Sequence, residues 1–256
     1  MAVHYQTDGP VAVITLDRPE VANAIDRPTA EELVSALQRF DAEGELSVAV
    51  LTGAGGKFCA GADLKAMRED GAPRASRVAP DGDGPVGPTR MLLGKPVIAA
   101  VEGHAVAGGL ELAAWCDLRV AAEDAVFGVY CRRWGIPLMD GGTIRLTRLL
   151  GHSQALDLIL TGRGVSGEEA LQMGLANRLV PPGQALPAAL ALAHELAARP
   201  QAALRSDRLS SYEQWSLPLT DALMREYEHG ISTLQTGELF GGLEDYASGG
   251  WRSGAA

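Results

Sequence analysis

Two segments of small residues place backbone amides and one carboxylate where they could act on a carbonyl oxygen. The first is segment 58–64, Phe-Cys-Ala-Gly-Ala-Asp-Leu, and the second is segment 95–112, which ends in Ala-Gly-Gly-Leu-Glu-Leu. Each puts small residues after an apolar strand and before a helix, so backbone N–H groups at the start of the helix can approach a ligand. Two such turns on neighbouring strands can direct two N–H donors at one oxygen, which is the geometry of an oxyanion hole.

Glu111 falls in the first turn of the helix that follows the second segment, close to the same point. A carboxyl group there could transfer a proton during a reaction of the bound carbonyl compound. An acidic residue in a first turn also interacts favourably with the helix dipole, and such residues are common. Spacing alone leaves both interpretations of Glu111 open.

Other motifs that carry chemistry are incomplete in this chain. Segment 53–57, Gly-Ala-Gly-Gly-Lys, lacks the first P-loop glycine, because Leu51 stands there, and lacks a Ser or Thr after Lys57. The third glycine of a dinucleotide-binding turn would fall on Phe58. Segment 151–155 lacks the final glycine and the preceding strand of a nucleophile elbow. The five histidines show no metal-binding spacing, so no metal site is predicted.

The elements that must position the two segments form an alternating pattern of strands and helices. Apolar runs predict strands over residues 11–16, 48–52, 96–101 and 117–121. Helical spacing predicts helices over residues 28–41, 63–69, 108–115, 155–160, 168–173, 184–198 and 217–236. Continuous apolar strands that alternate with helices are typical of a parallel sheet covered on both faces. We therefore predict an α/β core over residues 1–190 and a helical C-terminal region over residues 191–256.

Segment 71–88 interrupts the alternation of strands and helices. It is rich in glycine and proline and contains hardly any large apolar side chain. Its composition predicts a mobile loop of the kind that often covers a binding site.

Length, composition and charge restrict the class of protein. A chain of 256 residues, with 46% hydrophobic and 21% charged residues, can bury a large core and is not disordered. The net charge of −10 argues against binding to nucleic acid or to an anionic membrane surface. The three cysteines are far apart, and neither a secretory signal nor an apolar run of membrane-spanning length is visible. A cytoplasmic protein without structural disulfides is therefore expected.

The two small-residue segments closely resemble the central motifs of the crotonase family (enoyl-CoA hydratase/isomerase). The resemblance extends over about the first 180 residues through short matches: Asp17-Arg18-Pro19, Asn23-Ala24, Cys116-Asp117, Phe127-Gly128, Gly141-Gly142-Thr143, Arg145-Leu146 and Leu160-Thr161-Gly162. For the fold, the resemblance implies an α/β architecture in which a layered β-β-α spiral core carries a C-terminal helical oligomerisation layer. It also implies trimers, which can pair into hexamers.

The resemblance assigns roles to individual residues of the two segments. In the family, two backbone N–H groups hold the thioester oxygen of an acyl-CoA, and these positions fall on Ala62 and Gly108. The first catalytic glutamate of the family falls on Glu111. The residues expected to line the coenzyme A channel are the neighbours of the first donor: Ala60, Gly61, Asp63 and Leu64. Coenzyme A would enter as part of the substrate, and no metal or redox cofactor is required.

The chain departs from the family pattern at the second catalytic carboxyl group. Typical hydratases carry a second glutamate shortly after the Phe-Gly pair, and that position is Cys131 here. A thiol, whose usual pKa is about 8.5, is a poor replacement for a carboxyl acid–base group near neutral pH. Some family members place an aspartate before the later Gly-Gly pair, which corresponds to Asp140. Asp140 is thus either the second catalytic group or an N-cap of the following helix.

The resemblance predicts an enzyme that stabilises a thioester enolate. Two carboxyl groups suit reversible addition of water to a 2-enoyl-CoA, with Glu111 transferring a proton or orienting the water and Asp140 as the second acid–base group. A single carboxyl group suits isomerisation of the double bond, so the replacement at Cys131 keeps an enoyl-CoA isomerase as an alternative. A non-catalytic member that binds acyl-CoA or RNA is a further alternative, although the negative charge opposes RNA binding and Glu111 is retained.

Overall fold

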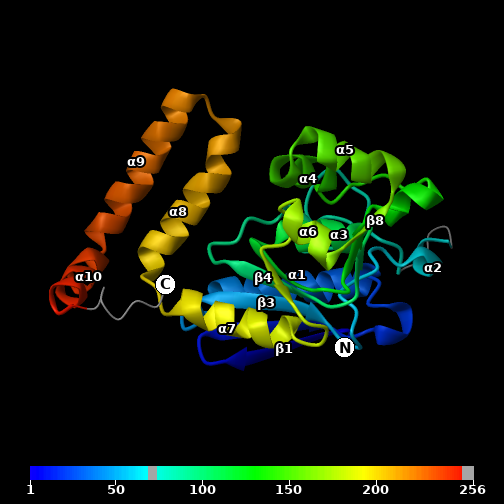
Figure 1. Ribbon diagram of the computed structural model, residues 1–256, viewed down its shortest axis with the longest axis horizontal. Coiled ribbons are helices and arrows are strands. Elements are labelled where there is room, and N and C mark those ends of the chain that lie inside the picture. The colour runs from blue at the N-terminus through cyan, green and yellow to red at the C-terminus, as the bar shows by residue number, and fades with distance from the viewer. Residues whose placement is uncertain (69–73, 250–256) are drawn as a thin grey trace. The chain divides into compact units, whose positions relative to one another are not determined.

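The computed structural model describes residues 1–68 and 74–249, and the chain divides into two compact units. The first unit spans Met1–His194 and the second spans Glu195–Ala256. Figure 1 shows the first unit as a layered arrangement of strands and helices and the second as helices alone.

A six-stranded sheet forms the centre of the first unit. Its strands follow the order β1 (Val3–Asp8), β2 (Val11–Leu16), β3 (Val48–Gly53), β4 (Val97–Val101), β6 (Leu118–Ala122) and β9 (Arg178–Val180). The pair β1–β2 is antiparallel, and all other neighbouring pairs are parallel. Every residue of β4 is buried, as is all of β3 except its last residue, which confirms that these apolar runs are interior parallel strands.

The first unit also contains a smaller sheet. Its three strands follow the order β5 (His104–Val106), β7 (Val126–Gly128) and β8 (Gly164–Ser166). The chain passes from β4 in the large sheet to β5 in the small sheet and then into a helix, and β6 is likewise followed by β7. This alternation confirms the predicted layered β-β-α core.

The helices of the first unit are α1 (Arg27–Ala42), α2 (Leu64–Met67), α3 (Gly108–Trp115), α4 (Gly142–Leu150), α5 (His152–Thr161), α6 (Gly167–Gln172) and α7 (Ala185–Ala197). In α1 the side chains of Leu33, Leu37 and Phe40 are fully buried on one face. Every residue of α3 is buried, and α3 contacts α4. A helix with apolar residues on all sides can only be stable inside the protein. Its single charged residue, Glu111, is thereby carried into the interior.

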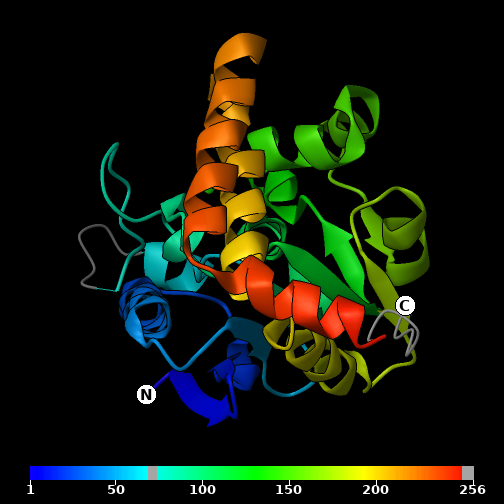
Figure 2. The same ribbon diagram turned by 90° about the vertical axis from the view of Figure 1, so that its left-hand side faces the viewer.

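The second unit consists of α8 (Gln201–Glu213), α9 (Leu219–Gln235) and α10 (Glu238–Ala247). In Figures 1 and 2, α8 and α9 lie side by side as a helical hairpin. The carboxylate of Glu213 at the end of α8 pairs with Arg225 at 2.5 Å and with His229 at 3.0 Å, both on α9. These contacts tie the two helices near their connection.

Several elements differ from the sequence prediction. Strand β1 was not predicted, because four of its six residues are exposed or half-exposed polar side chains. The helix predicted over residues 155–160 begins earlier, at His152, and a further helix, α4, precedes it; Gly151 separates the two, with a φ of 77°, a left-handed value. Other missed elements are strands β5, β7, β8 and β9 and helices α8 and α10.

The predicted loop 71–88 has a different character in its second half. Residues 71–73 lie outside the described residues, whereas residues 84–89 are all buried. Val86 is 1% exposed and belongs to the hydrophobic core, so the expectation of a segment without apolar anchors was wrong there. No helix within residues 1–68 and 74–249 is long and apolar enough to span a membrane.

Candidate active site

The two small-residue segments are joined by a short ladder of backbone hydrogen bonds. Cys59 donates to the His104 carbonyl at 2.9 Å, and Val106 donates to the Cys59 carbonyl at 3.0 Å. A side chain on Gly109 would place its Cβ 2.0 Å from the Cys59 carbonyl oxygen, so only glycine allows this approach. The start of α3 is therefore pressed against the turn that carries Ala62.

Ala107 directs the first amide of α3 through an unusual backbone conformation. Its φ of 53° and ψ of −126° lie in a region that residues with a side chain rarely adopt. The conformation costs roughly 1–3 kcal/mol and persists only where its surroundings enforce it. Here Ala107 donates to the Gly128 carbonyl at 2.8 Å and thereby ties the turn to β7. Such strain is concentrated at functional sites, which is consistent with the role expected for Gly108.

The amides of Ala62 and Gly108 have no hydrogen-bond acceptor within residues 1–68 and 74–249. Both residues line the same cavity, and a Cβ on Gly108 would lie 3.5 Å from the Ala62 nitrogen. Backbone donors in a protein interior are nearly always paired, so two neighbouring unpaired donors indicate a place for a ligand oxygen.

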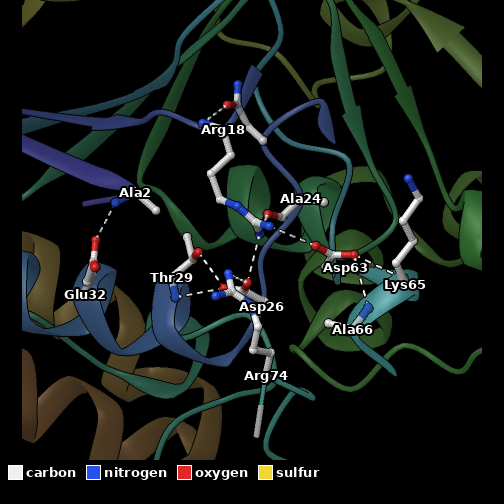
Figure 3. A network of polar contacts seen from close by, with 11 residues as sticks. Ala2, Arg18, Ala24, Asp26, Thr29, Glu32, Asp63, Lys65, Ala66 and Arg74 are labelled. Carbon is white, nitrogen blue, oxygen red and sulfur yellow. Dashed lines mark hydrogen bonds and ion pairs between the residues drawn. The ribbon is translucent and has the colours of Figure 1, made fainter. Parts of the chain in front are cut away.

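A buried ionic network holds the turn at Ala62 in place, and Figure 3 shows it at close range. Asp63 caps α2 by accepting hydrogen bonds from the amides of Lys65 and Ala66 at 3.1 and 3.3 Å. The Arg18 guanidinium donates to the other oxygen of Asp63 at 3.0 Å and approaches Asp26, the cap of α1, at 3.4 Å. Arg18 therefore connects the starts of α1 and α2.

Glu111 projects from the first turn of α3 toward the start of α4. Its Oε1 accepts hydrogen bonds from the amides of Asp140 at 2.9 Å and Gly142 at 2.8 Å. Burial and then the neighbouring charge of Asp140 raise the pKa of Glu111 to about 7. The carboxyl group can therefore gain or lose a proton near neutral pH.

The second oxygen of Glu111 faces the cavity. Oε2 has no hydrogen-bond partner among the described residues, and it is not one of the buried polar atoms sealed from solvent. Gly142 allows the close approach on the other side, because a Cβ there would lie 2.8 Å from Cγ of Glu111. One oxygen is thus fixed by two amides, and the other is left for a ligand.

Asp140 is not the cap of α4. The residue at the cap position is Gly141, no side chain caps the helix, and the Asp140 carboxylate turns away from it. Its Oδ1 accepts hydrogen bonds from Thr89 Oγ1 at 2.5 Å and from the Val86 amide at 3.1 Å. Burial raises the pKa of Asp140 despite these hydrogen bonds. The helix-cap interpretation of Asp140 is therefore wrong.

One cavity collects most of the predicted site residues. Its lining includes both predicted donors, both predicted carboxyl groups and the replaced glutamate position: Ala62, Gly108, Glu111, Asp140 and Cys131. Ala60 and Leu64 also line this cavity, whereas Gly61 and Asp63 are not among the described residues that do so. The Asp63 carboxylate is occupied by Arg18 and by the cap of α2.

Cys131 lies in the short helical turn η3 (Tyr130–Trp134) and is 5% exposed. Burial, and then the charge of Glu111, raise the pKa of its thiol. The thiol therefore stays protonated near neutral pH and contributes an apolar, polarisable surface to the cavity wall. Among the described residues, no cluster of three or more side chains could hold a metal ion.

Sequence reasoning missed the residues that hold Asp140. Thr89 and Val86 bind its carboxylate, and the Arg145 guanidinium donates to the Asp140 carbonyl at 2.8 Å and to the Thr89 carbonyl at 2.6 Å. No spacing rule connects residues 89 and 140. A conserved pairing in aligned homologues is the kind of signal that could have linked them.

Comparison with known proteins agrees with this geometry. The family model described as enoyl-CoA hydratase/isomerase matches residues 6–248. The chain is 36% identical over 250 residues to enoyl-CoA hydratase EchA19 of Mycobacterium tuberculosis, covering 93% of this chain and 91% of that protein. It is 43% identical over 197 residues to carnitinyl-CoA dehydratase of Salmonella typhi, covering 76% and 74%.

Solved structures give the same result. The crystal structure of enoyl-CoA hydratase EchA1 from Mycobacterium marinum superposes with a TM-score of 0.90 at 35% identity, covering 96% of both chains. Enoyl-CoA hydratase from M. tuberculosis also gives a TM-score of 0.90, at 34% identity and 96% coverage of both chains. The fold is therefore that of enoyl-CoA hydratases. The chain belongs to the enoyl-CoA hydratase/isomerase family, the crotonase family.

The contact between Gly109 and Cys59 predicts a destabilising substitution. Gly109→Ala is expected to lower the free energy of unfolding by about 1–3 kcal/mol, because the added methyl group overlaps the Cys59 carbonyl. Gly44→Ala is the matched control, since a Cβ there meets nothing within 4 Å and its φ is not left-handed. Chemical denaturation of the two variants and the parent protein measures the difference, and equal stability of both variants would contradict the close approach.

The raised pKa of Glu111 predicts that its charge destabilises the fold. Below about pH 4.5 the carboxyl group is neutral in both states, and as pH rises to about 7 only the unfolded state ionises freely. The free energy of unfolding therefore falls by roughly 3 kcal/mol over this pH window, at about 1.4 kcal/mol per pKa unit. Glu111→Gln avoids the loss, so its stability advantage should grow from pH 4.5 to 7 and then level off. Thermal denaturation against pH tests this, and parallel profiles would contradict it.

Proposed function

We propose that this enzyme catalyses the reversible addition of water to the double bond of a 2-enoyl-CoA. The proposal rests on the groups that line one cavity, which are two unpaired backbone donors and two carboxyl groups. Each carboxyl group has one oxygen without a hydrogen bond from the described residues. The thioester oxygen would accept hydrogen bonds from the amides of Ala62 and Gly108. These donors stabilise the enolate that forms when water attacks C3, and loss of one such donor typically costs about 10²–10³ in rate.

Hydration needs one group that accepts a proton and one that donates a proton. When the water oxygen bonds to C3, one water proton must leave, and C2 must receive a proton to complete the product. Glu111 and Asp140 can perform both transfers if the pair holds a single proton. That state is supported by the pKa of about 7 for Glu111, which includes the effect of a charged Asp140. In this state Glu111 carries the proton that goes to C2, and the Asp140 carboxylate accepts the proton from water.

Cys131 takes no part in proton transfer in this proposal. Its buried thiol holds its proton more tightly than a free cysteine does, and Asp140 supplies the second carboxyl group instead. The replacement by Cys131 still favours a second candidate, isomerisation of a 3-enoyl-CoA by Glu111 alone. The free Oδ2 of Asp140 beside the same cavity supports hydration over this alternative.

Coenzyme A is the part of the substrate that Ala60 and Leu64 would contact at the cavity, with Gly61 and Asp63 shaping the turn between them. The chemistry requires no metal or redox cofactor. We also infer a cytoplasmic homotrimer, or a hexamer made from two trimers. Exposed apolar side chains on α9 and α10 support assembly through the second unit: Leu223, Met224, Tyr227, Phe240 and Leu243. Analytical ultracentrifugation of the intact protein tests the assembly.

A panel of acyl-CoAs tests the reaction. Purified protein should convert 2-enoyl-CoAs to 3-hydroxyacyl-CoAs and should catalyse the reverse reaction, with products identified by mass. Glu111→Gln should lower kcat by at least about 10²-fold with little change in coenzyme A affinity. Asp140→Asn should also lower hydration strongly, whereas Cys131→Ser should have a small effect. Retained 3-enoyl-CoA isomerisation in Asp140→Asn, without hydration by the parent protein, would favour the isomerase.

The shared proton predicts a bell-shaped pH dependence. The value of kcat/KM for hydration should fall as pH rises above about 7, because the pair then loses the proton that Glu111 donates. It should also fall at acid pH, where Asp140 becomes protonated and can no longer accept a proton. A rate that rises steadily through pH 7 to a plateau would show that the doubly charged pair is the active form and would overturn this assignment.

A further inference from the structure

Thr89 holds the Asp140 carboxylate through its hydroxyl group and is not among the described residues that line the cavity. It lies in the helical turn η2 (Pro88–Arg90), is 1% exposed, and its hydroxyl group is 2.5 Å from Oδ1 of Asp140. The Val86 amide donates to the same oxygen at 3.1 Å. Oδ2 has no hydrogen-bond partner among the residues the structure describes, and it is not sealed from solvent. The two oxygens of Asp140 therefore have different surroundings.

Two glycines before Thr89 allow its hydroxyl group to approach the Asp140 carboxylate. Gly84 and Gly87 exchange two backbone hydrogen bonds of 2.9 Å, which close the turn that precedes Thr89. A Cβ on Gly84 would lie 2.2 Å from Thr89 Oγ1 and 2.4 Å from Asp140 Oδ1, so no side chain fits there. Gly87 has a φ of 101°, which also requires glycine. Both glycines keep the hydroxyl group and the carboxylate in direct contact.

Arg145 fixes the two partners from the main-chain side. One nitrogen of its guanidinium donates to the Asp140 carbonyl at 2.8 Å and another to the Thr89 carbonyl at 2.6 Å. The planar guanidinium thus sets the separation of the two residues. The hydrogen bond from the Thr89 hydroxyl group sets the rotation of the Asp140 carboxylate. Packing alone would leave that rotation free, because a carboxylate is nearly symmetric.

We propose that Thr89 is a positioning residue for proton transfer: with the Val86 amide it occupies Oδ1, so the proton that Asp140 accepts in each turnover is carried on Oδ2. The inference rests on the proposed function, in which Asp140 accepts a proton from the attacking water. In that step the water O–H bond breaks and its proton bonds to Oδ2 as the water oxygen bonds to C3. Glu111 gives its proton to C2, and proton exchange with solvent after product release restores the starting state.

The hydroxyl group also favours the charged form of Asp140. A donor to a carboxylate stabilises the anion, so removal of the hydroxyl group should raise the pKa of Asp140. The other charged or titratable groups that act on Asp140 are Glu111 on α3, Arg145 on α4 and Arg90 on η2. The buried thiol of Cys59 also feels its charge. Because a substitution at Thr89 leaves all of these in place, a change in the pH profile can be attributed to the lost donor.

The experiment compares Thr89→Val, which keeps the shape and removes the hydroxyl group, with Thr89→Ser, which keeps the hydroxyl group. Thr89→Val should lower kcat for hydration by about ten-fold or more, as expected for loss of a hydrogen bond to a charged group, with KM within about three-fold. Its acid-side pH limb should move up by about one unit. Thr89→Ser should restore both. Normal kcat and an unshifted limb in folded Thr89→Val would overturn the proposal.

Thr52→Val is the matched control for a lost buried hydroxyl group. Thr52 lies in β3, is 4% exposed, and donates one hydrogen bond to the Ala100 carbonyl at 3.1 Å. This variant should lose stability while keeping kcat and the pH profile. A matching fall in kcat in Thr52→Val would mean that the effect at Thr89 is general destabilisation, and the proposal would be wrong.

A measurement on the parent protein covers the case in which Thr89→Val does not fold. At acid pH, where Asp140 is protonated, the infrared difference between parent and Asp140→Asn isolates the C=O stretch of the Asp140 carboxylic acid. If Oδ2 carries the proton, the carbonyl oxygen is Oδ1 with two donors, and the band should lie at the low frequency of a strongly hydrogen-bonded acid. A band at the frequency of a free carbonyl would overturn the proposal. Full hydration activity in Asp140→Asn would instead overturn the role of Asp140 in the proposed function.

Discussion

The acceptance of two backbone hydrogen bonds by one oxygen of Glu111 is the interaction on which the site depends. It joins the first turn of α3 to the amides that begin α4, and these helices also contact each other. Because α3 is buried on all sides, Glu111 is only 3% exposed, and it lines the cavity. The same two amides bring Asp140 close enough to raise the pKa of Glu111. The contact between the two helix ends therefore fixes the position of Glu111 and brings Asp140 beside it, whereas burial is the main cause of its raised pKa.

In each of the two carboxyl groups, one oxygen accepts two hydrogen bonds from the protein and the other oxygen accepts none from the described residues. Backbone amides hold Glu111, whereas Asp140 is held by one amide and one hydroxyl group. A substitution does not remove a backbone N–H donor unless it introduces proline, whereas a substitution at Thr89 can remove the hydroxyl donor. The family position occupied here by Cys131 is therefore not simply lost: a carboxyl group from another segment faces the same cavity.

Much of the large sheet could be predicted from the sequence because buried parallel strands are continuous apolar runs, as in β3 and β4. The position of Ala62, Gly108 and Glu111 at one cavity could be predicted because the two segments that carry them resemble the central motifs of the family. Strand β1 could not, since it has one buried residue and otherwise partly or fully exposed ones. The contacts of Asp140 could not be predicted either, because Val86 and Thr89 reach it only through the tertiary fold. The sequence also could not exclude Asp140 as a helix cap, because the direction of its carboxylate depends on these tertiary contacts.

The proposed oxyanion hole consists of main-chain atoms, so its geometry does not depend on the side chains that select the acyl group. The donors are aligned by the ladder between residues 59 and 106 and by the glycine contact at Gly109. Most of the cavity wall comes from other segments, including Val78, Trp134 and Met139. Substitutions in the wall can therefore alter which acyl groups fit while the alignment of the donors stays constant. Substrate preference can thus diverge through single substitutions at the wall that leave the backbone geometry of the two donors unchanged.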